Sequence, residues 1–243
     1  MKAISRGAWT LVSFVLLATA PPARGAAGAP QISPSQSRAE LMRHHFDSAV
    51  GARDAVIRGD LSVARSDARA LLSEPDPPGI PESGAPHLKA FRAEAERAVK
   101  AVDLEQAAAA TSSMLATCGD CHRAVGTMPA RPTPPEPTIG GVLGHMEEHK
   151  VAAELMAQGL TTPSTSLWMD GADALVTAPL HKADLPDTAK ISRDALTAEA
   201  SIHALATRAR ATSDTAGRVR VYSALIVACS TCHAANGRAG PTP

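Results

Sequence analysis

The chain has 243 residues, with 24 Lys and Arg, 24 Asp and Glu, and an aromatic content of only 2%. Residues 1–25 carry three basic and no acidic side chains, so the rest of the chain has 21 basic against 24 acidic residues, a net charge of −3. A mildly acidic chain without a long basic run is not expected to bind nucleic acid. The remaining residues suit one large domain or two small ones.

Residues 1–25 have the composition of a secretory signal peptide. Lys2 and Arg6 form a basic start, residues 8–20 form an apolar centre, and Ala23-Arg24-Gly25 is a small-x-small cleavage sequence. The apolar run is too short to span a bilayer, and no later run is longer and as apolar. We expect no integral membrane segment, a periplasmic or secreted location, and a flexible leader over residues 26–36.

Four helices are predicted in residues 37–125. Their approximate ranges are 37–58, 61–73, 86–101 and 104–122. Gly59 marks the end of the first helix, and the breaker-rich residues 74–79 mark the end of the second. The inner face of the first helix follows a spacing of three and four residues. It comprises Met42, His45, Ala49, Ala52 and Val56.

The fourth predicted helix contains Cys118-Gly119-Asp120-Cys121-His122. Two cysteines three apart and followed by histidine have the spacing for covalent haem attachment, with the imidazole as iron ligand. Positions i and i+3 share a helix face, so both thiols can meet one haem edge. A redox dithiol and a zinc site are alternatives. However, the adjacent histidine is too close for the usual zinc-finger spacing, and no alternation of strands and helices surrounds the pair.

Residues 126–138 are predicted to form a proline-rich linker and a domain boundary. Four further helices are predicted in the second domain, residues 139–238, followed by a tail over 239–243. Their approximate ranges are 139–158, 167–177, 189–211 and 213–233, the last containing Cys229-Ser230-Thr231-Cys232-His233. The recurrence of helix order, breakers and motif indicates a tandem duplication.

Gly159 is taken as the residue that ends the first helix of the second domain. Aligning it with Gly59 makes His145 the residue that corresponds to His45. The inner face of that helix becomes Val142, His145, His149, Ala152 and Met156. In the last helices, Met114, Cys118 and Cys121 correspond to Leu225, Cys229 and Cys232.

Each domain resembles the class II c-type cytochromes, the cytochrome c-prime group, because the haem motif is in the last helix and a side chain on the first helix faces inward. In class I cytochromes the motif lies early, whereas here only residues 234–243 follow the second motif. The resemblance implies an all-α fold of two tandem four-helix bundles, each with haem c at its C-terminal helix. Two covalent haems and their iron are expected on Cys118, Cys121, Cys229 and Cys232, with His122 and His233 as iron ligands.

In that family the side chain opposite the proximal histidine is a methionine or a non-ligating apolar residue of the first helix. This chain offers His45 and His145 instead, which predicts bis-histidine, six-coordinate, low-spin irons. A histidine hydrogen-bonded within the bundle is an alternative. Three rival ligands lie one residue or one helical turn from these histidines: Met42, His44 and His149. Two more lie just before the third helices: His87 and His181. His203 has no counterpart in the first domain and is predicted to lie on a helix surface.

These features predict a dihaem c-type cytochrome that transfers electrons between a redox protein donor and acceptor, rather than an enzyme. Binding or sensing of nitric oxide or carbon monoxide by high-spin haems is the alternative if the inner histidines do not ligate. A dihaem peroxidase is disfavoured by the near-equivalence of the two sites. By analogy with related bundles, a homodimer is also considered.

Overall fold

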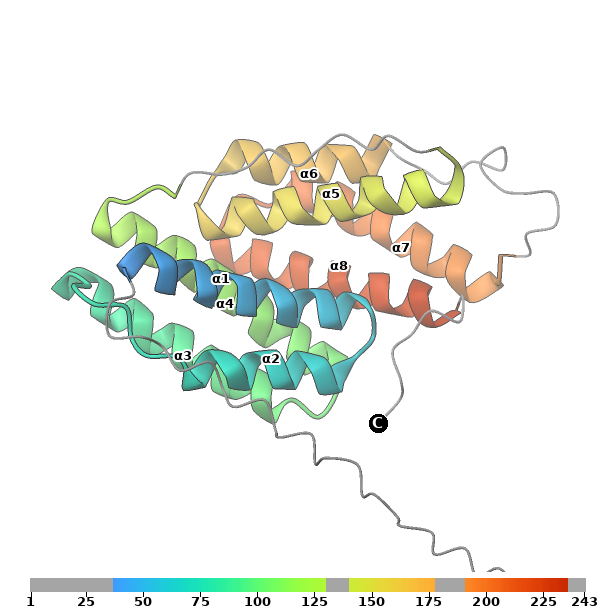
Figure 1. Cartoon of the computed structure of the whole chain (residues 1–243). Coiled ribbons are helices and arrows are strands. Elements are labelled where there is room, and N and C mark those ends of the chain that lie inside the picture. The colour runs from blue at the N-terminus through green and yellow to red at the C-terminus, as the bar shows by residue number, and fades with distance from the viewer. Residues whose placement is uncertain (1–36, 130–139, 178–190, 236–243) are drawn as a thin grey trace, which may run out of the picture. The chain divides into compact units, whose positions relative to one another are not determined.

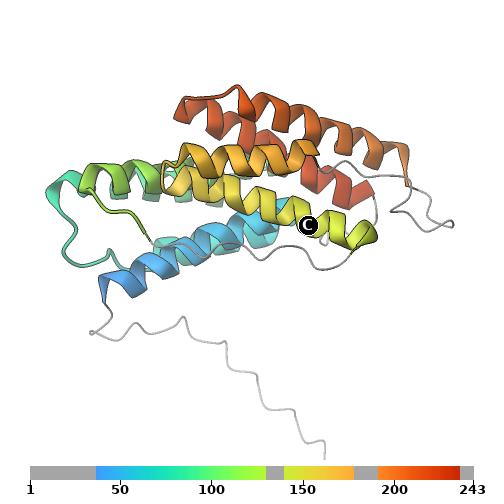
Figure 2. The same cartoon turned by 90° about the horizontal axis from the view of Figure 1, so that it is seen from above.

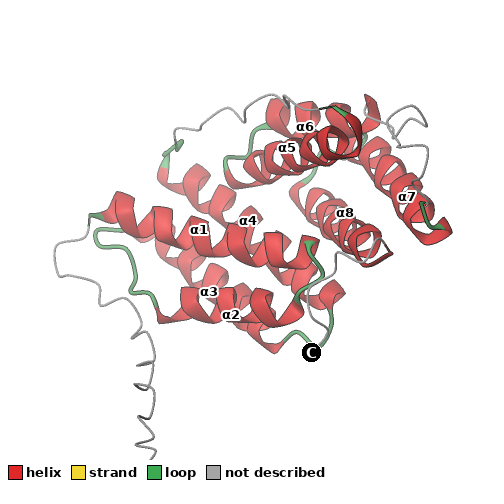
Figure 3. Cartoon of the chain, turned by 45° about the vertical axis from the view of Figure 1, so that its right-hand side comes forward, coloured by secondary structure: helices red, strands yellow, loops and turns green. Residues whose placement is uncertain are grey.

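The computed structural model describes residues 37–129, 140–177 and 191–235, and every regular element among them is helical (Figures 1 and 3). The predicted all-α class is therefore confirmed. The predicted signal peptide, the leader up to Gln36, most of the linker, and the tail lie outside the described residues. Residues 37–129, here called the first half, contain α1 (Arg38–Ile57), α2 (Leu61–Ser73), the 3-10 helix η1 (Glu82–Gly84), α3 (Ala85–Lys100) and α4 (Leu104–Val125).

Residues 140–235 are here called the second half. It contains α5 (Gly141–Thr161), α6 (Thr165–Thr177), α7 (Arg193–Arg210) and α8 (Thr215–Ala235). None of the helices described in either half combines the length and the apolar character that a membrane span requires.

Local signals define several helix ends. The Ser37 hydroxyl accepts a hydrogen bond from the Glu40 backbone N–H, and the Glu40 carboxylate accepts one from the Ser37 N–H, which is a capping box at the start of α1. Asp103 caps α4 through the Gln106 N–H. Gly126 ends α4 in the left-handed conformation with φ 69°. The first cysteine motif therefore occupies the last turns of α4.

The predicted inner faces of the two first helices are confirmed by burial. Both faces turn histidines toward the interior, at positions that the sequence pattern had placed on them. The buried members are His45, Ala49, Ala52 and Val56 on α1, and His145, His149, Ala152 and Met156 on α5.

The predicted end of the helix before Gly159 is wrong, because α5 continues to Thr161. Gly59 has φ 78° and follows α1 in a conformation that favours glycine. Gly159 instead lies within its helix, where a Cβ atom would be 2.7 Å from the Trp168 backbone nitrogen. Glycine at 159 permits the close approach of α6, so the two glycines used for the alignment have different structural roles.

Helix neighbours follow the same order in both halves. In the first half, α1 and α3 each pack against α2 and α4; in the second, α5 and α7 each pack against α6 and α8. Figure 2 shows α5 and α6 side by side. Contacts also cross between the halves, because α4 packs against α5 and α8, and α1 packs against α8. A single hydrophobic core therefore includes side chains of both halves.

Polar contacts reinforce this junction. The buried Arg53 of α1 donates a hydrogen bond from Nη1 to Glu154 Oε2 of α5 at 2.6 Å and also pairs with Asp54. The fully buried Tyr222 of α8 donates its hydroxyl to the Ala153 carbonyl of α5 at 2.9 Å. A buried guanidinium needs such partners to offset its lost hydration. The junction is thus held by specific contacts as well as by apolar packing.

Candidate functional site

The first motif faces the protein interior at the end of α4. Cys118 is half-buried, and no disulfide joins it to Cys121. Burial, with a smaller effect of Cys121, raises the pKa of Cys118 to about 12, and burial also raises the pKa of Cys121. Reactive dithiols need a lowered thiol pKa. Both pKa values are shifted in the direction opposite to the one that a reactive dithiol needs.

His122 has a defined hydrogen-bond partner in the second half. Its Nδ1 lies 2.7 Å from the backbone carbonyl oxygen of Thr161, the last residue of α5. A carbonyl only accepts, so Nδ1 carries the proton and donates it. In the neutral imidazole this leaves the lone pair on Nε2, the arrangement found in many metal-ligating histidines.

The inner histidine of the first half is buried between an aromatic ring and a carboxylate. The ring of His45, which is 3% exposed, stacks on Phe91 of α3 with centroids 5.8 Å apart. Its Nε2 is 3.4 Å from Glu74 Oε2, yet neither atom has a hydrogen-bond partner. Burial lowers the pKa of His45, and Glu74 opposes this effect. His45 is therefore a buried imidazole whose Nε2 faces a carboxylate without a hydrogen bond.

The second motif lies near the end of α8 and faces α7. The buried Cys232 packs with Ala195 and Ala198 of that helix. Burial raises the pKa of Cys229 to about 12, and Cys232 and then Glu199 add to this effect. Glu199 follows Ala198, which packs with Cys232, so this carboxylate belongs to the part of α7 that contacts the second motif.

Three histidines converge on Glu199 in the second half, forming what we call the Glu199 cluster. The distances from Glu199 Oε1 are 2.9 Å to His145 Nε2, 3.8 Å to His149 Nε2 and 2.9 Å to His203 Nε2. The rings of His145 and His149 are 4.1 Å apart between centroids. His203 was predicted to lie on the surface; this is wrong, because it is half-buried and turned toward Glu199 one helical turn away.

The cluster keeps Glu199 ionised. Burial alone would raise the pKa of this carboxyl group, but its contacts with His145, His149 and His203 outweigh burial and lower the pKa to about 2. The second half therefore contains a buried negative charge beside its inner histidine. In the first half a carboxylate, that of Glu74, also lies beside His45.

Among the described residues, only His145, His149 and Glu199 form a group of three metal-ligand side chains with ligand atoms within 4.8 Å of one another. Neither cysteine pair forms such a group, which argues against the zinc alternative at the motifs. Imidazole and carboxylate are both ligands of divalent transition metals.

The other candidate ligands occupy less suitable places. His44 is exposed, whereas Met42 on α1 and His87 in the first turn of α3 are half-buried. His181 lies outside the described residues. His45, the histidine predicted on the inner face of α1, is therefore more buried than its neighbour His44.

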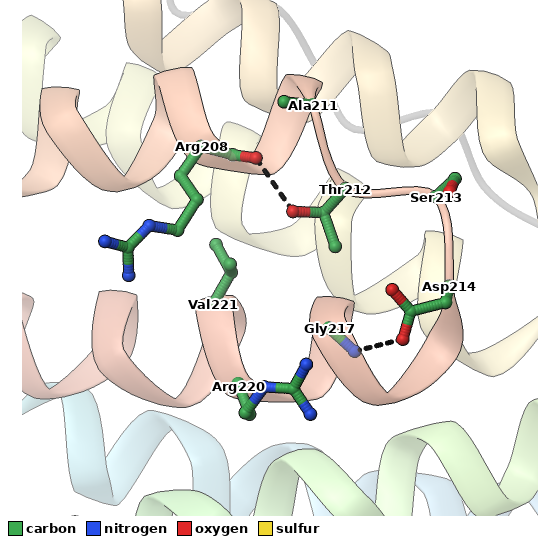
Figure 4. Close-up of a pocket in the computed structure, with 8 residues that line it drawn as sticks. All are labelled: Arg208, Ala211, Thr212, Ser213, Asp214, Gly217, Arg220 and Val221. Carbon is green, nitrogen blue, oxygen red and sulfur yellow. Dashed lines mark hydrogen bonds between the residues drawn. The ribbon is translucent and has the colours of Figure 1, made fainter.

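One cavity lies away from the cysteines, and a second reaches Ile80, beside the first motif: a Cβ atom at Gly84 would be 2.8 Å from Ile80 Cγ2 and 3.6 Å from Cys121 Sγ. One, of about 290 Å³, is at the turn between α7 and α8, where Asp214 accepts a hydrogen bond from the Gly217 N–H (Figure 4). It is at the opposite end of α8 from Cys229 and Cys232. The other, of about 670 Å³, lies between the segment before α3 and the outer side of that helix. Neither contains a predicted ligand.

No known protein family, curated protein or solved structure matches this chain.

The described side chains of each half include the residue types that a covalent haem site uses. Each half has a cysteine pair at the end of its last helix and a buried histidine on its first helix. His45 Nε2 has no hydrogen-bond partner, whereas His145 Nε2 lies 2.9 Å from Glu199 Oε1. An unsatisfied buried polar atom costs about 1–3 kcal/mol, which binding to a metal would offset. In the first half, the His122 tautomer also suits ligation.

Sequence reasoning missed Glu74, Glu199 and Thr161. Only Glu199 has a local signal, since its spacing of four from His203 places both on one helix face. Glu74 and the Thr161 carbonyl are brought to the site by packing between distant segments.

Proposed function

We propose that this protein is a periplasmic or secreted dihaem c-type cytochrome that transfers electrons between a protein donor and a protein acceptor. The observation that carries the proposal is the pairing, in both halves, of a Cys-x-x-Cys-His motif at the end of the last helix with a buried histidine on the first helix. The resemblance to tandem class II four-helix bundles belongs to the same proposal.

Each residue type has a distinct role in this proposal. The two haems would be held covalently by Cys118, Cys121, Cys229 and Cys232, and their irons would be bound by His122 and His233. His45 and His145 would supply the second imidazole of each iron. When bound, each haem supplies one iron that exchanges an electron between the ferric and ferrous states.

The helices around the inner histidines restrict their movement. His45 is held between Phe91 and Glu74, and His145 is held within the Glu199 cluster. Side chains that stay in place reduce the reorganisation that accompanies electron transfer, and they exclude water and external ligands from the distal side. This favours a carrier over gas binding or peroxide cleavage.

The test is the visible spectrum of the full-length protein matured with a haem-attachment system, recorded oxidised, reduced, and reduced under carbon monoxide. Two covalent haems with sharp low-spin bands and no response to carbon monoxide are the expected result. Haems that are high-spin and bind carbon monoxide would favour the gas-binding alternative. Absence of covalent haem would refute the proposal.

A second candidate is binding of a divalent metal ion by the Glu199 cluster, favoured by the convergence of His145, His149 and His203 on one carboxylate. It would compete with the second haem for His145. Its test is titration of the full-length chain with Co²⁺, whose visible bands report coordination. One bound ion, with at least tenfold weaker binding in His149→Ala and unchanged binding in His44→Ala, is expected of this candidate.

A further inference from the structure

We infer that the second half of the chain tunes the first haem, with the Thr161 carbonyl at the end of α5 orienting His122 and strengthening it as an iron ligand. This inference rests on the proposed function, because it concerns the control of one of the two proposed haems. Thr161 acts through His122 and is therefore a positioning residue.

The end of α5 provides an acceptor of the right kind. Carbonyl groups in the last turn of a helix lack intrahelical donors and lie at the negative end of the helix dipole. The Thr162 backbone N–H bonds to Gln158, and Thr161 is itself buried at 4% exposure. His122 Nδ1–H meets the Thr161 carbonyl at 2.7 Å. A backbone acceptor fixed in a helix cannot rotate away as a side chain could.

Gly119, inside the first motif, permits this contact. A Cβ atom at 119 would lie 2.1 Å from the Leu160 carbonyl oxygen and 3.1 Å from Pro163 Cδ. The first of these distances is far below van der Waals contact, so any larger residue would force the two segments apart. Glycine therefore allows α4 to approach the end of α5 closely enough for His122 to reach Thr161.

The contact has a direct consequence for the electron affinity of the haem. A hydrogen bond from Nδ1–H to a carbonyl raises the basicity of the ligating Nε2. A more basic ligand stabilises the ferric state and lowers the reduction potential. The negative end of the α5 dipole acts in the same direction.

The same helix reaches the second site. His145 lies sixteen residues before Thr161 on α5, which is about 24 Å along a helix axis. One helix thus carries the distal candidate of the second haem and the proximal acceptor of the first. A displacement of α5 at either site would be transmitted to the other.

The test compares Gly119→Ala with the matched control Gly140→Ala in the full-length holoprotein. A Cβ atom at Gly140, which has φ −99°, meets nothing within 4 Å. Spectroelectrochemistry should show that Gly119→Ala raises one of the two potentials, corresponding to about a tenfold larger reduction constant or about 59 mV. The other potential and both potentials of the control should be unchanged. Two attached haems with unchanged potentials in Gly119→Ala would overturn the inference.

A measurement on the wild-type protein covers the case in which Gly119→Ala does not fold. In the reduced, diamagnetic holoprotein, NMR reports exchange of the His122 Nδ1 proton with solvent. Protection from exchange is expected of a proton bonded to Thr161, and exchange as fast as in an exposed imidazole would overturn the inference. Absence of covalent haem in the wild type would instead refute the proposed function.

Discussion

The buried histidines of the two halves occupy matching helix faces but have different surroundings. Phe91 and Glu199 each lie six residues after the first residue of the third helix of their half. In the first half this position stacks an aromatic ring on His45; in the second it places a carboxylate against His145. Both histidines face a carboxylate, but it comes from different elements: Glu74, the residue after α2, in the first half, and Glu199 of α7 in the second.

The cysteine pairs provide the strongest test that both halves carry a cofactor. Replacing Cys118 and Cys121 with alanine should abolish covalent attachment in the first half only, and replacing Cys229 and Cys232 should abolish it in the second half only. Mass spectrometry should show one attached haem in each double variant and two in the wild type. Retention of two covalent haems in either variant would show that the replaced cysteines are not an attachment site and that the halves are not equivalent.

Spin state tests whether the matching histidines have matching roles. His45→Ala and His145→Ala should each convert one haem to a high-spin, carbon monoxide-binding form, because each variant removes the proposed distal ligand. Visible spectra and carbon monoxide titration measure this change, with the exposed neighbour replaced in His44→Ala as control. Low-spin spectra in both single variants would contradict the distal assignment.

The junction between the halves can be weakened at Arg53. Arg53→Ala should lower the free energy of unfolding by about 1.5–3 kcal/mol, because Glu154 and Asp54 lose their charged hydrogen bonds to the buried guanidinium. Urea denaturation measures the loss and shows whether the halves then unfold separately. The exposed pair of Arg97 and Glu94 is the control, and Arg97→Ala should change stability by less than about 0.5 kcal/mol. Equal losses in the two variants would argue against a structural role for the junction.

The smallest expected effect concerns the charge of the Glu199 carboxylate beside His145. Glu199→Gln removes the negative charge near the second motif, so the second haem should become easier to reduce by a few-fold in equilibrium constant, with little change at the first. Spectroelectrochemistry of the two haems measures this shift. The matched control is Glu94→Gln on α3, remote from the histidines of the second half. Equal shifts in both variants would show that Glu199 has no local effect.

Much of the fold could be predicted from local sequence. The caps at Ser37 and Asp103, the left-handed Gly126, and the spacing of three and four along α1 and α5 are properties of short segments, so the helices and the burial of His45 and His145 followed from them. The cysteine motifs are equally local. Their positions near the ends of α4 and α8 required no knowledge of packing.

Tertiary structure alone decided which groups meet these residues. The sequence predicted that Gly159 ends a helix, but this residue permits the close approach of Trp168. The sequence also predicted that His203 lies on the surface, but its side chain turns toward Glu199. The partner of His122 is a backbone carbonyl, which no side-chain pattern encodes. Local periodicity determines which way a residue faces along its own helix, whereas the atom opposite it depends on how distant helices pack.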